Sequence, residues 1–168
     1  KYNDNKDIYL FNKALSNENK PARFNFNKHN LTSSLSSLDP DNSYLKLKAK
    51  LFGTTSKGMI IDTKTIQTTT LFSILEKEYI ENIDFLKIDT EGHELEVLQW
   101  MKEKINKVKR ILVEFHIDEI YISYNPEILH QFLISNKFHL FQFLEILYSF
   151  STHLNIHVKI VFYEKDFS

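Results

Sequence analysis

The spacing of hydrophobic residues changes abruptly near residue 90. Before it, apolar side chains form a short and nearly continuous run, at Ile83, Phe85, Leu86 and Ile88. Such a run is typical of a strand that is covered on both faces in a parallel sheet. After it, apolar residues recur at helical spacing, at Leu95, Leu98, Met101, Ile105 and Val108. The pattern predicts a strand over 83–88, a tight turn, and a helix from Glu94 to Lys104.

Short segments rich in apolar residues predict four further strands upstream, and the second and third of them alternate apolar with polar residues. We expect strands at Ile8 to Leu15, around Phe24 to Phe26, at Leu45 to Leu51 and at Met59 to Ile61. In the third of these the intervening lysines would protect an edge strand. The segment from Thr32 to Asn42 is rich in Ser, Asp and Pro, which predicts a surface loop.

Capping signals predict two more helices. Thr70 can cap a helix whose core-facing residues are Leu71, Ile74, Leu75 and Tyr79. Asn125 and Pro126 supply a cap and a first helical residue for a helix that runs to Ser135 and is closed by Asn136.

The remaining segments decide the predicted fold class. Arg110 to Phe115 is strand-like, and Phe138 to Leu144 with Ile156 to Tyr163 predicts a terminal antiparallel hairpin. Alternating strands and helices favour an α/β fold with a mostly parallel sheet. We expect a single domain over residues 1–168, because this length and composition suit one hydrophobic core.

Composition narrows the functional classes. The formal net charge is −1, which does not favour binding to a nucleic-acid backbone. The longest apolar region, 138–150, is shorter than the roughly 20 residues that span a bilayer, so we expect no membrane partner. The chain has no cysteine, which is compatible with a reducing cytoplasm, where we expect the protein. A small polar molecule is the favoured ligand.

Acidic and imidazole side chains occur at the predicted carboxyl ends of two strands. Asp89 and Glu91 follow the strand over 83–88, and Glu114 and His116 end the next strand. Open α/β sheets bind ligands at this edge, so we expect the four side chains to converge. A divalent metal held between them is one interpretation, because carboxylates and imidazole suit several such ions.

Each residue near the turn also has a structural interpretation. Asp89 could cap the following helix, and Glu91 could be a solvated acid in its first turn. His93 is either a base that takes a proton from a hydroxyl or an exposed surface residue. Gly92 suits a positive φ or a close approach, and Glu94 could fold back onto the turn as part of a cap.

The block LKIDTEGHELEVL, residues 86–98, resembles the FkbM family of S-adenosylmethionine-dependent methyltransferases. Weaker agreement covers most of the chain, at 14–16 (AlaLeuSer), 33–35 (SerSerLeu), 70–71 (ThrLeu) and 113–115 (ValGluPhe). The resemblance implies a Rossmann-type methyltransferase sheet. It also implies S-adenosylmethionine at the carboxyl edge of that sheet and a methyl acceptor that is a hydroxyl of a sugar (glycan) or small molecule.

The resemblance also assigns roles to residues. It implies that Asp89, Ala14 and Leu15 bind the cofactor and that Glu91 and Glu114 bind the substrate. Asp89, His93 and His116 are the candidate catalytic residues, with His93 or His116 as the possible base.

Such enzymes open with a strand and a Gly-rich turn that approaches the cofactor. The glycines here are Gly53, Gly58 and Gly92, so we expect a fold truncated at the amino end, beginning after the first two strands. Two alternatives stay open. One is a non-catalytic remnant that serves as an interaction module, and the other is a metal-dependent hydrolase.

Overall fold

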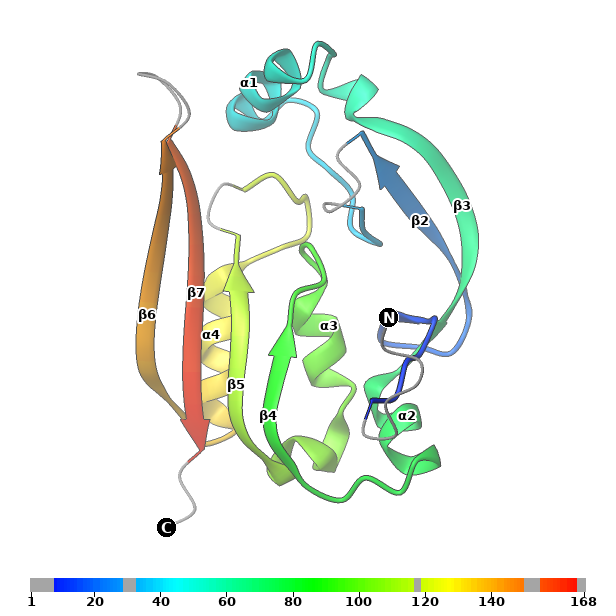
Figure 1. The fold of residues 1–168 in the computed structure, drawn as a ribbon, viewed down its shortest axis with the longest axis vertical. Helices are drawn as coiled ribbons and strands as arrows, with labels where there is room; N and C mark the ends of the chain where they lie inside the picture. Colours follow the sequence, from blue (N-terminus) through cyan, green and yellow to red (C-terminus); the bar gives the residue numbers. More distant parts are fainter. Residues whose placement is uncertain (1–7, 29–32, 117–118, 150–154, 166–168) are drawn as a thin grey trace.

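The computed structural model describes residues 8–28, 33–116, 119–149 and 155–165, which form a mixed α/β fold with two sheets (Figure 1). In chain order the strands and helices are β1 (Ala14–Leu15), β2 (Pro21–Asn27), α1 (Ser43–Leu51), a 3₁₀ helix (Lys57–Met59), β3 (Ile60–Thr69), α2 (Leu71–Lys77), β4 (Ile83–Ile88), α3 (Glu94–Gln99), a 3₁₀ helix (Lys102–Lys107), β5 (Val108–Phe115), α4 (Pro126–Ser135), β6 (Phe138–Ser149) and β7 (Asn155–Lys165).

The two sheets are small, and each mixes strand directions. The first has the order β1-β3-β2 and the second the order β4-β5-β7-β6. Only the β1–β3 and β4–β5 pairs are parallel among the described strands. The expectation of one mostly parallel sheet is therefore corrected. Between β2 and β3 the chain forms α1 and a 3₁₀ helix. The predicted antiparallel pair at the end of the chain is confirmed as β6 and β7, and β7 also lies antiparallel beside β5.

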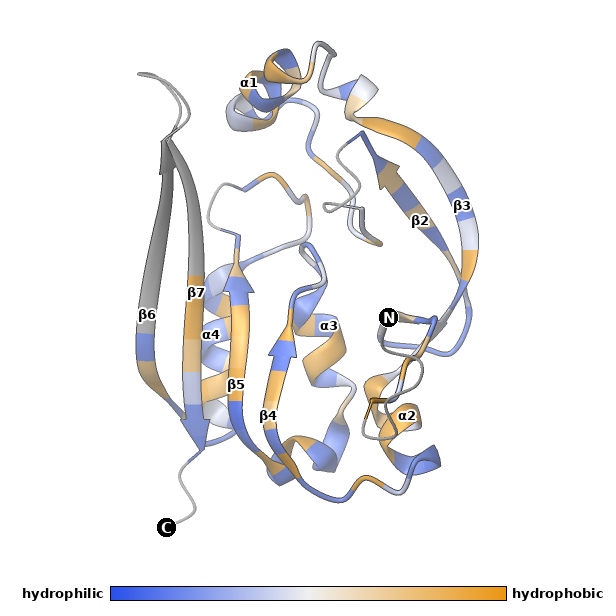
Figure 2. Cartoon of the chain, viewed as in Figure 1, coloured by the Kyte–Doolittle hydropathy of each residue, from blue (hydrophilic) through white to orange (hydrophobic). Residues whose placement is uncertain are grey.

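Helices α3 and α4 pack on one face of the four-stranded sheet (Figure 1). Val108, Ile111 and Val113 of β5 are fully buried in this core, and Figure 2 shows the corresponding apolar stretch along the strand. The prediction that β4 is covered on both faces is wrong, because Phe85 is 51% exposed and Lys87 is also exposed. Among the described residues, helices cover only the face that carries Ile88.

Residues 43–51 form a helix, so the prediction of an edge strand at Leu45 to Leu51, protected by its lysines, is wrong. The Asn42 side chain caps α1 by accepting a hydrogen bond from the Leu45 backbone N–H at 2.9 Å. Leu45 and Ala49 are each 1% exposed, whereas Leu47 and Leu51 are 40% and 60% exposed. The spacing of four between the buried residues is helical. The Leu-Lys alternation has the period of a strand, but it does not match the burial.

A second core cluster lies between α1 and the loop that leads to α4, and it contains Leu38, Leu45, Ala49, Met59, Ile120 and Tyr121. The segment 33–42, which we expected on the surface, takes part in it. Ser34 is 1% exposed and pairs with Asn25, and Leu38 pairs with Tyr121. The segment is therefore packed between β2 and the loop near Tyr121.

Several local predictions are confirmed. Thr70 caps α2, and Asn125 caps α4, which Asn136 closes. Tyr79 is not a core residue: it lies beyond the end of α2 with a φ of 54° and is 90% exposed. Helix α3 ends at Gln99 rather than Lys104. No helix among the described residues is long and apolar enough to cross a membrane.

Candidate functional site

The turn between β4 and α3 is built around the buried carboxylate of Glu94. Its Oε1 accepts hydrogen bonds from the Thr90 N–H at 2.9 Å, the Gly92 N–H at 3.1 Å and the Thr90 hydroxyl at 3.2 Å. Glu94 therefore folds back onto the turn, as predicted. The N-cap of α3 is His93, not Asp89, so the capping interpretation of Asp89 is wrong.

Two serines of the 33–42 segment hold the same turn from its other side. The Ser34 hydroxyl lies 2.7 Å from the Glu91 carbonyl oxygen and 3.2 Å from that of Thr90. The Ser36 hydroxyl donates to the Gly92 carbonyl at 2.7 Å. Backbone donors and acceptors of the turn are thus both satisfied, which fixes the direction of the side chains that leave it.

Gly92 meets two requirements that exclude a side chain. Its φ is +86°, in the left-handed region, and a Cβ built on it would lie 2.5 Å from Cγ of Tyr121. The turn therefore packs directly against the Tyr121 ring. Both explanations offered for this glycine from the sequence, positive φ and close approach, are confirmed.

Glu91 is held by the same tyrosine. The Tyr121 hydroxyl donates to Glu91 Oε2 at 2.5 Å. Burial raises the pKa of Glu91 above its ordinary value, although the Tyr121 hydrogen bond and the charge of His116 oppose the shift. Glu91 is therefore a partly buried acid with a fixed direction and not a solvated surface residue.

His116 lies at the end of β5 and is 7% exposed. Its Nε2 is 3.7 Å from Glu94 Oε1, and the rings of Tyr121 and Tyr124 meet its ring edge-on at 5.0 and 5.3 Å. Burial alone would lower the pKa of His116, but the carboxylates of Glu94, Glu114 and Glu91 outweigh it and raise the pKa. His116 therefore holds its proton more tightly than an ordinary histidine does.

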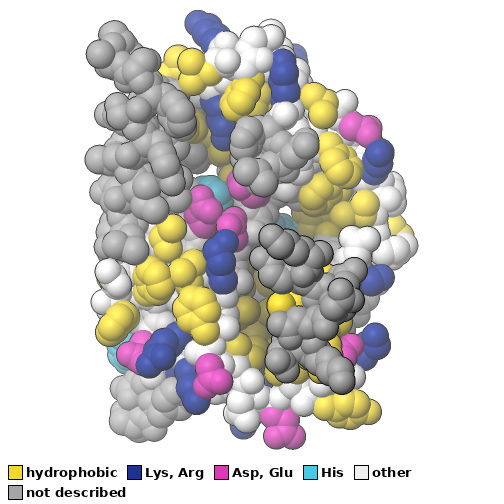
Figure 3. Space-filling view, in the orientation of Figure 1, with side chains coloured by type: hydrophobic (Ala, Val, Ile, Leu, Met, Phe, Trp, Pro, Cys, Tyr) yellow, Lys and Arg dark blue, Asp and Glu magenta, His cyan; other side chains and the backbone are white. Residues whose placement is uncertain are grey.

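Glu114 and Asp89 bring two more carboxyl groups to this place. Burial raises the pKa of Glu114 to about 7. The charge of His116 opposes this shift, whereas the carboxylates of Asp89 and Glu91 add to it. Asp89 also forms an ion pair of 2.5 Å with Lys87. Figure 3 shows acidic side chains gathered beside a histidine above the four-stranded sheet. We call Asp89, Glu91, Glu114 and His116 the acid–histidine cluster.

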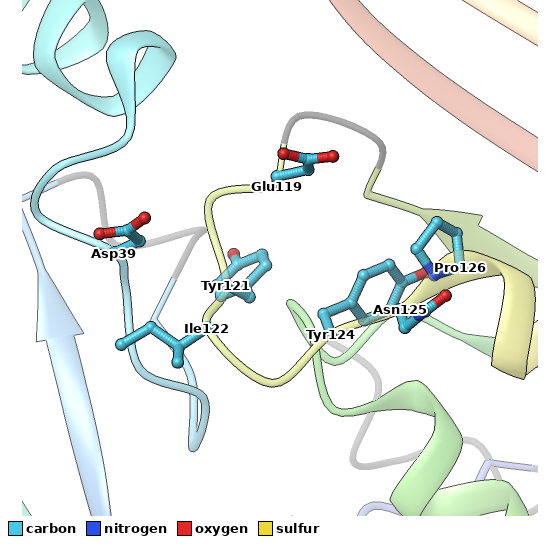
Figure 4. A pocket seen from close by; sticks show the side chains of 7 residues that line it. All are labelled: Asp39, Glu119, Tyr121, Ile122, Tyr124, Asn125 and Pro126. Atoms are coloured by element: carbon cyan, nitrogen blue, oxygen red, sulfur yellow. The ribbon is translucent and has the colours of Figure 1, made fainter.

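Two cavities adjoin the acid–histidine cluster. The smaller, of about 330 Å³, is lined by Asp89 together with Leu15, Leu71 and Leu86. The larger, of about 660 Å³, is lined by Asp39, Glu119, Tyr121, Ile122, Tyr124, Asn125 and Pro126 (Figure 4). The cluster lines the smaller cavity through Asp89. It reaches the larger cavity through Glu91, which is hydrogen-bonded to Tyr121 in the wall of that cavity.

A family model for the methyltransferase FkbM domain matches residues 1–148. The chain belongs to this family. No curated protein and no solved structure gives a significant match. The matched part of the FkbM domain includes the turn after β4, the end of β5 and the residues that line both cavities.

The structure of the FkbM domain brings most of the predicted site residues together. Asp89 meets Leu15 in the smaller cavity, and Glu91, Glu114 and His116 converge with Asp89 as expected. Ala14 lies elsewhere: it lines a separate cavity with Asn12, Lys13, Ile66 and Gln67. Successive residues of a strand point to opposite sides, so Ala14 and Leu15 cannot both face Asp89.

His93 is neither an exposed residue nor part of the acid–histidine cluster. Its side chain is 16% exposed, with Nε2 3.0 Å from the Ser16 hydroxyl and Nδ1 3.7 Å from Glu96 Oε2. Burial lowers the pKa of His93, although Glu96 and Glu94 oppose the shift. The ring therefore favours its neutral form and connects α3 to the residue that follows β1.

Sequence reasoning missed the residues that support the site from other segments. Ser34 and Ser36 were assigned to a surface loop, and Tyr121 and Tyr124 were given no role. One signal was available: two tyrosines three residues apart, shortly after a histidine at a strand end.

Within the described part of the FkbM domain, no group of three or more His, Asp or Glu side chains is arranged to hold a metal ion. The geometry therefore gives no support to the metal-dependent hydrolase.

Proposed function

We propose that this FkbM domain transfers a methyl group from S-adenosylmethionine to a hydroxyl of a sugar or another small molecule. Family membership supports methyl transfer in general. The observation that carries the finer proposal is the acid–histidine cluster, which adjoins one cavity through Asp89 and the other through the Glu91–Tyr121 pair. Two neighbouring cavities suit a cofactor and an acceptor that must meet.

We propose the smaller cavity as part of the cofactor site. The side chains of Leu15, Leu71 and Leu86 offer an apolar lining that suits an adenine ring, and the Asp89 carboxylate suits an amino group or a ribose hydroxyl. When bound, S-adenosylmethionine supplies an electrophilic methyl group. Asp89 then acts by binding and orientation, and its ion pair with Lys87 holds the carboxylate in position.

We propose a Rossmann-type arrangement for the sheet that carries this site, formed by a single domain over residues 1–168. Its support is the parallel β4–β5 pair, with the site at the carboxyl ends of both strands and the antiparallel strands β7 and β6 following. Tyr124 packs against both core clusters, which joins the two sheets into one unit.

On the acceptor side, Glu114 is the proposed general base. With a pKa of about 7 it is ionised in a large fraction of molecules near neutral pH and still basic enough to take the proton of an acceptor hydroxyl. Glu91 and the Tyr121 hydroxyl would bind and orient that hydroxyl, a role that their mutual hydrogen bond supports. His116, held cationic by Glu94, would stabilise the negative charge that develops beside it.

This assignment changes the expected roles of the two histidines. His116 stays in the catalytic group, but as a positive charge and not as a base. His93 is proposed as a link between α3 and β1 through Ser16, because its ring nitrogens face Ser16 and Glu96.

Isothermal titration with S-adenosylmethionine tests the cofactor proposal, using the protein as its gene encodes it. We expect saturable binding that is weakened at least about tenfold by Asp89→Asn, which corresponds to the loss of a hydrogen bond to a charged group. Asp84→Asn is the matched control, since Asp84 lies on β4, the strand that Asp89 follows, with its side chain 84% exposed. Absence of saturable binding would contradict the proposal and favour the non-catalytic interaction module.

A methyl-transfer assay with radiolabelled cofactor tests the base. Glu114→Gln should lower kcat by about 10² to 10⁴-fold with little change in cofactor binding. An unchanged kcat in this variant would remove Glu114 from the reaction while leaving the cofactor site in place.

A further inference from the structure

The outer surface of α1 carries apolar side chains where a helix on a protein surface usually carries polar ones. Leu45 and Ala49 bury the inner side of the helix. On the outer side, Leu47 and Leu51 are 40% and 60% exposed, and Phe52, which follows the helix, is 37% exposed. Leu47 and Leu51 are one helical turn apart, so they form a continuous apolar row.

Basic side chains border this row. Residues 43–58 contain four lysines and no acid, although the whole chain has a net charge of −1. Lys46 and Lys50 are exposed and lie next to Leu47 and Leu51 in a parallel row. Lys28 adds a further charge, since its ammonium group donates to the Phe52 carbonyl at 2.7 Å. The nearest acidic partner is Asp41, 3.3 Å from Lys46, and its side chain is 91% exposed.

We propose that α1 docks this protein on a membrane surface that contains anionic phospholipids. An apolar row flanked by lysines on an amphipathic helix matches the interface between acyl chains and anionic headgroups. Each lysine near such a surface contributes attraction, and the leucines enter the headgroup boundary. Nucleic acid would match the lysines but would leave the leucine row exposed to water.

The inner side of α1 connects this surface to the proposed acceptor cavity. Leu45 and Ala49 pack in the cluster that contains Tyr121, and Tyr121 lines the larger cavity. Lys48 lies close enough to Glu91 for its charge to lower the pKa of that carboxyl. A protein docked through α1 would therefore hold the larger cavity near the membrane, because Tyr121 lines that cavity and packs in the same cluster as the inner side of α1. Figure 1 shows α1 and the loop that leads to α4 in the same half of the molecule.

This inference goes beyond the proposed methyl transfer and does not depend on it. It also revises the expectation of no membrane partner, which considered only segments that span a bilayer. The proposed contact is at the surface of the membrane.

Vesicle co-sedimentation tests the proposal, with the full chain and vesicles of phosphatidylcholine alone or mixed equally with phosphatidylglycerol. We expect binding only to the mixed vesicles. The double variant Lys46→Glu/Lys50→Glu should weaken partitioning by at least about 30-fold, since each lysine near an anionic surface contributes about fivefold. Leu47→Ser/Leu51→Ser should weaken it by about tenfold or more through lost apolar burial.

Two matched variants control for general effects of charge and hydrophobicity. Lys77→Glu/Lys107→Glu reverses two exposed lysines elsewhere, and Ile128→Ser/Ile134→Ser removes two exposed apolar residues of α4 that are 51% and 40% exposed. Both should bind mixed vesicles like the unmodified protein, and circular dichroism verifies that every variant is folded.

Absence of binding to the mixed vesicles would overturn the proposal. Binding that is lost in the lysine variant but unchanged in the leucine variant would also overturn it, because charge alone would then account for the binding. Equal loss in the control variants would mean that no specific surface is involved.

Discussion

Two glutamates approach His116 from different segments, and their surroundings give them opposite protonation preferences. Glu94 is fully buried, and burial alone would raise its pKa, but His116 and the turn N–H groups outweigh burial and lower it. Glu114 is less buried, yet burial together with the carboxylates of Asp89 and Glu91 raises its pKa to about 7. The donors around each carboxyl, and not the degree of burial, decide which one stays ionised.

The two carboxyl groups therefore have different roles: Glu94 begins α3, whereas Glu114 lies near the end of β5. Glu94 accepts three hydrogen bonds and fixes the turn, so its charge serves the fold. Glu114 faces other acids, so its proton is exchangeable near neutral pH, which is typical of functional carboxyl groups. The substitutions below test whether the two roles are as distinct as the geometry indicates.

Removing the Glu94 carboxylate should have the largest effect. Glu94→Ala leaves the turn N–H groups and a buried cationic His116 without their partner, and we expect a loss of about 3–5 kcal/mol in the free energy of unfolding. Urea denaturation measures this loss. Glu96→Ala is the control, since its side chain is 30% exposed, and it should change stability by only about 0.5 kcal/mol. Equal losses in the two variants would contradict the anchoring role of Glu94.

Gly92→Ala should cost about 3 kcal/mol, because it combines a positive φ with a contact of 2.5 Å to the Tyr121 ring. Gly53 offers a matched control: its φ is +63°, but a Cβ there would meet no atom within 4 Å. Gly53→Ala should therefore show only the backbone strain, about 1 kcal/mol. Thermal denaturation of both variants separates the two contributions, and equal costs would argue against close packing of the turn on Tyr121.

The protonation of Glu114 should appear as a pH dependence of stability. A folded-state pKa of about 7, raised from 4.5, gives stability that is fully present below pH 4.5 and lost as the pH rises through 7. Glu114→Gln cannot ionise, so at pH 8 it should be more stable than the unmodified protein by about 1–2 kcal/mol. At pH 5 the two should differ little. Chemical denaturation at both pH values measures the difference in stability between the two proteins. A variant that is less stable than the unmodified protein at pH 8 would contradict the raised pKa of Glu114.

Tyr121→Phe should have the smallest effect. It removes the hydrogen bond to Glu91 but keeps the ring that packs against Gly92 and His116, so we expect a loss of about 1 kcal/mol. The pKa of Glu91 should rise further, because that hydrogen bond favours its charged form. Tyr79→Phe, at a side chain that is 90% exposed, should leave stability unchanged. A similar change in both variants would show that the hydroxyl contact contributes nothing.

Features set by local chemistry could be predicted from the sequence. Asn125, Pro126 and Asn136 bound α4 as expected, and Glu94 folds back onto its own turn, because a cap involves residues only a few positions apart. The convergence of Asp89 and Glu114 was also predictable, since the ends of adjacent parallel strands meet at one edge.

Features set by distant packing could not be predicted. The alternating leucines and lysines of α1 have the period of a strand, but the burial of Leu45 and Ala49 against Met59 makes the segment helical. The contacts of Ser34 with the turn and of Tyr121 with Gly92 join segments far apart in sequence, and even the paired tyrosines do not indicate which turn they contact. The residues that support the site from distant segments, such as Ser34 and Tyr121, could therefore be identified only from the structure.

Carboxyl carbon NMR titration of the glutamates tests the central claim most directly, with Glu114→Gln and Glu94→Gln used to assign the two signals. The account predicts that the Glu114 signal titrates near pH 7, while the Glu94 signal remains that of a carboxylate until the pH falls below the ordinary range of glutamate. Two signals that titrate together at an ordinary pKa would contradict the claim that hydrogen-bond donors, and not burial, set the charges at this site.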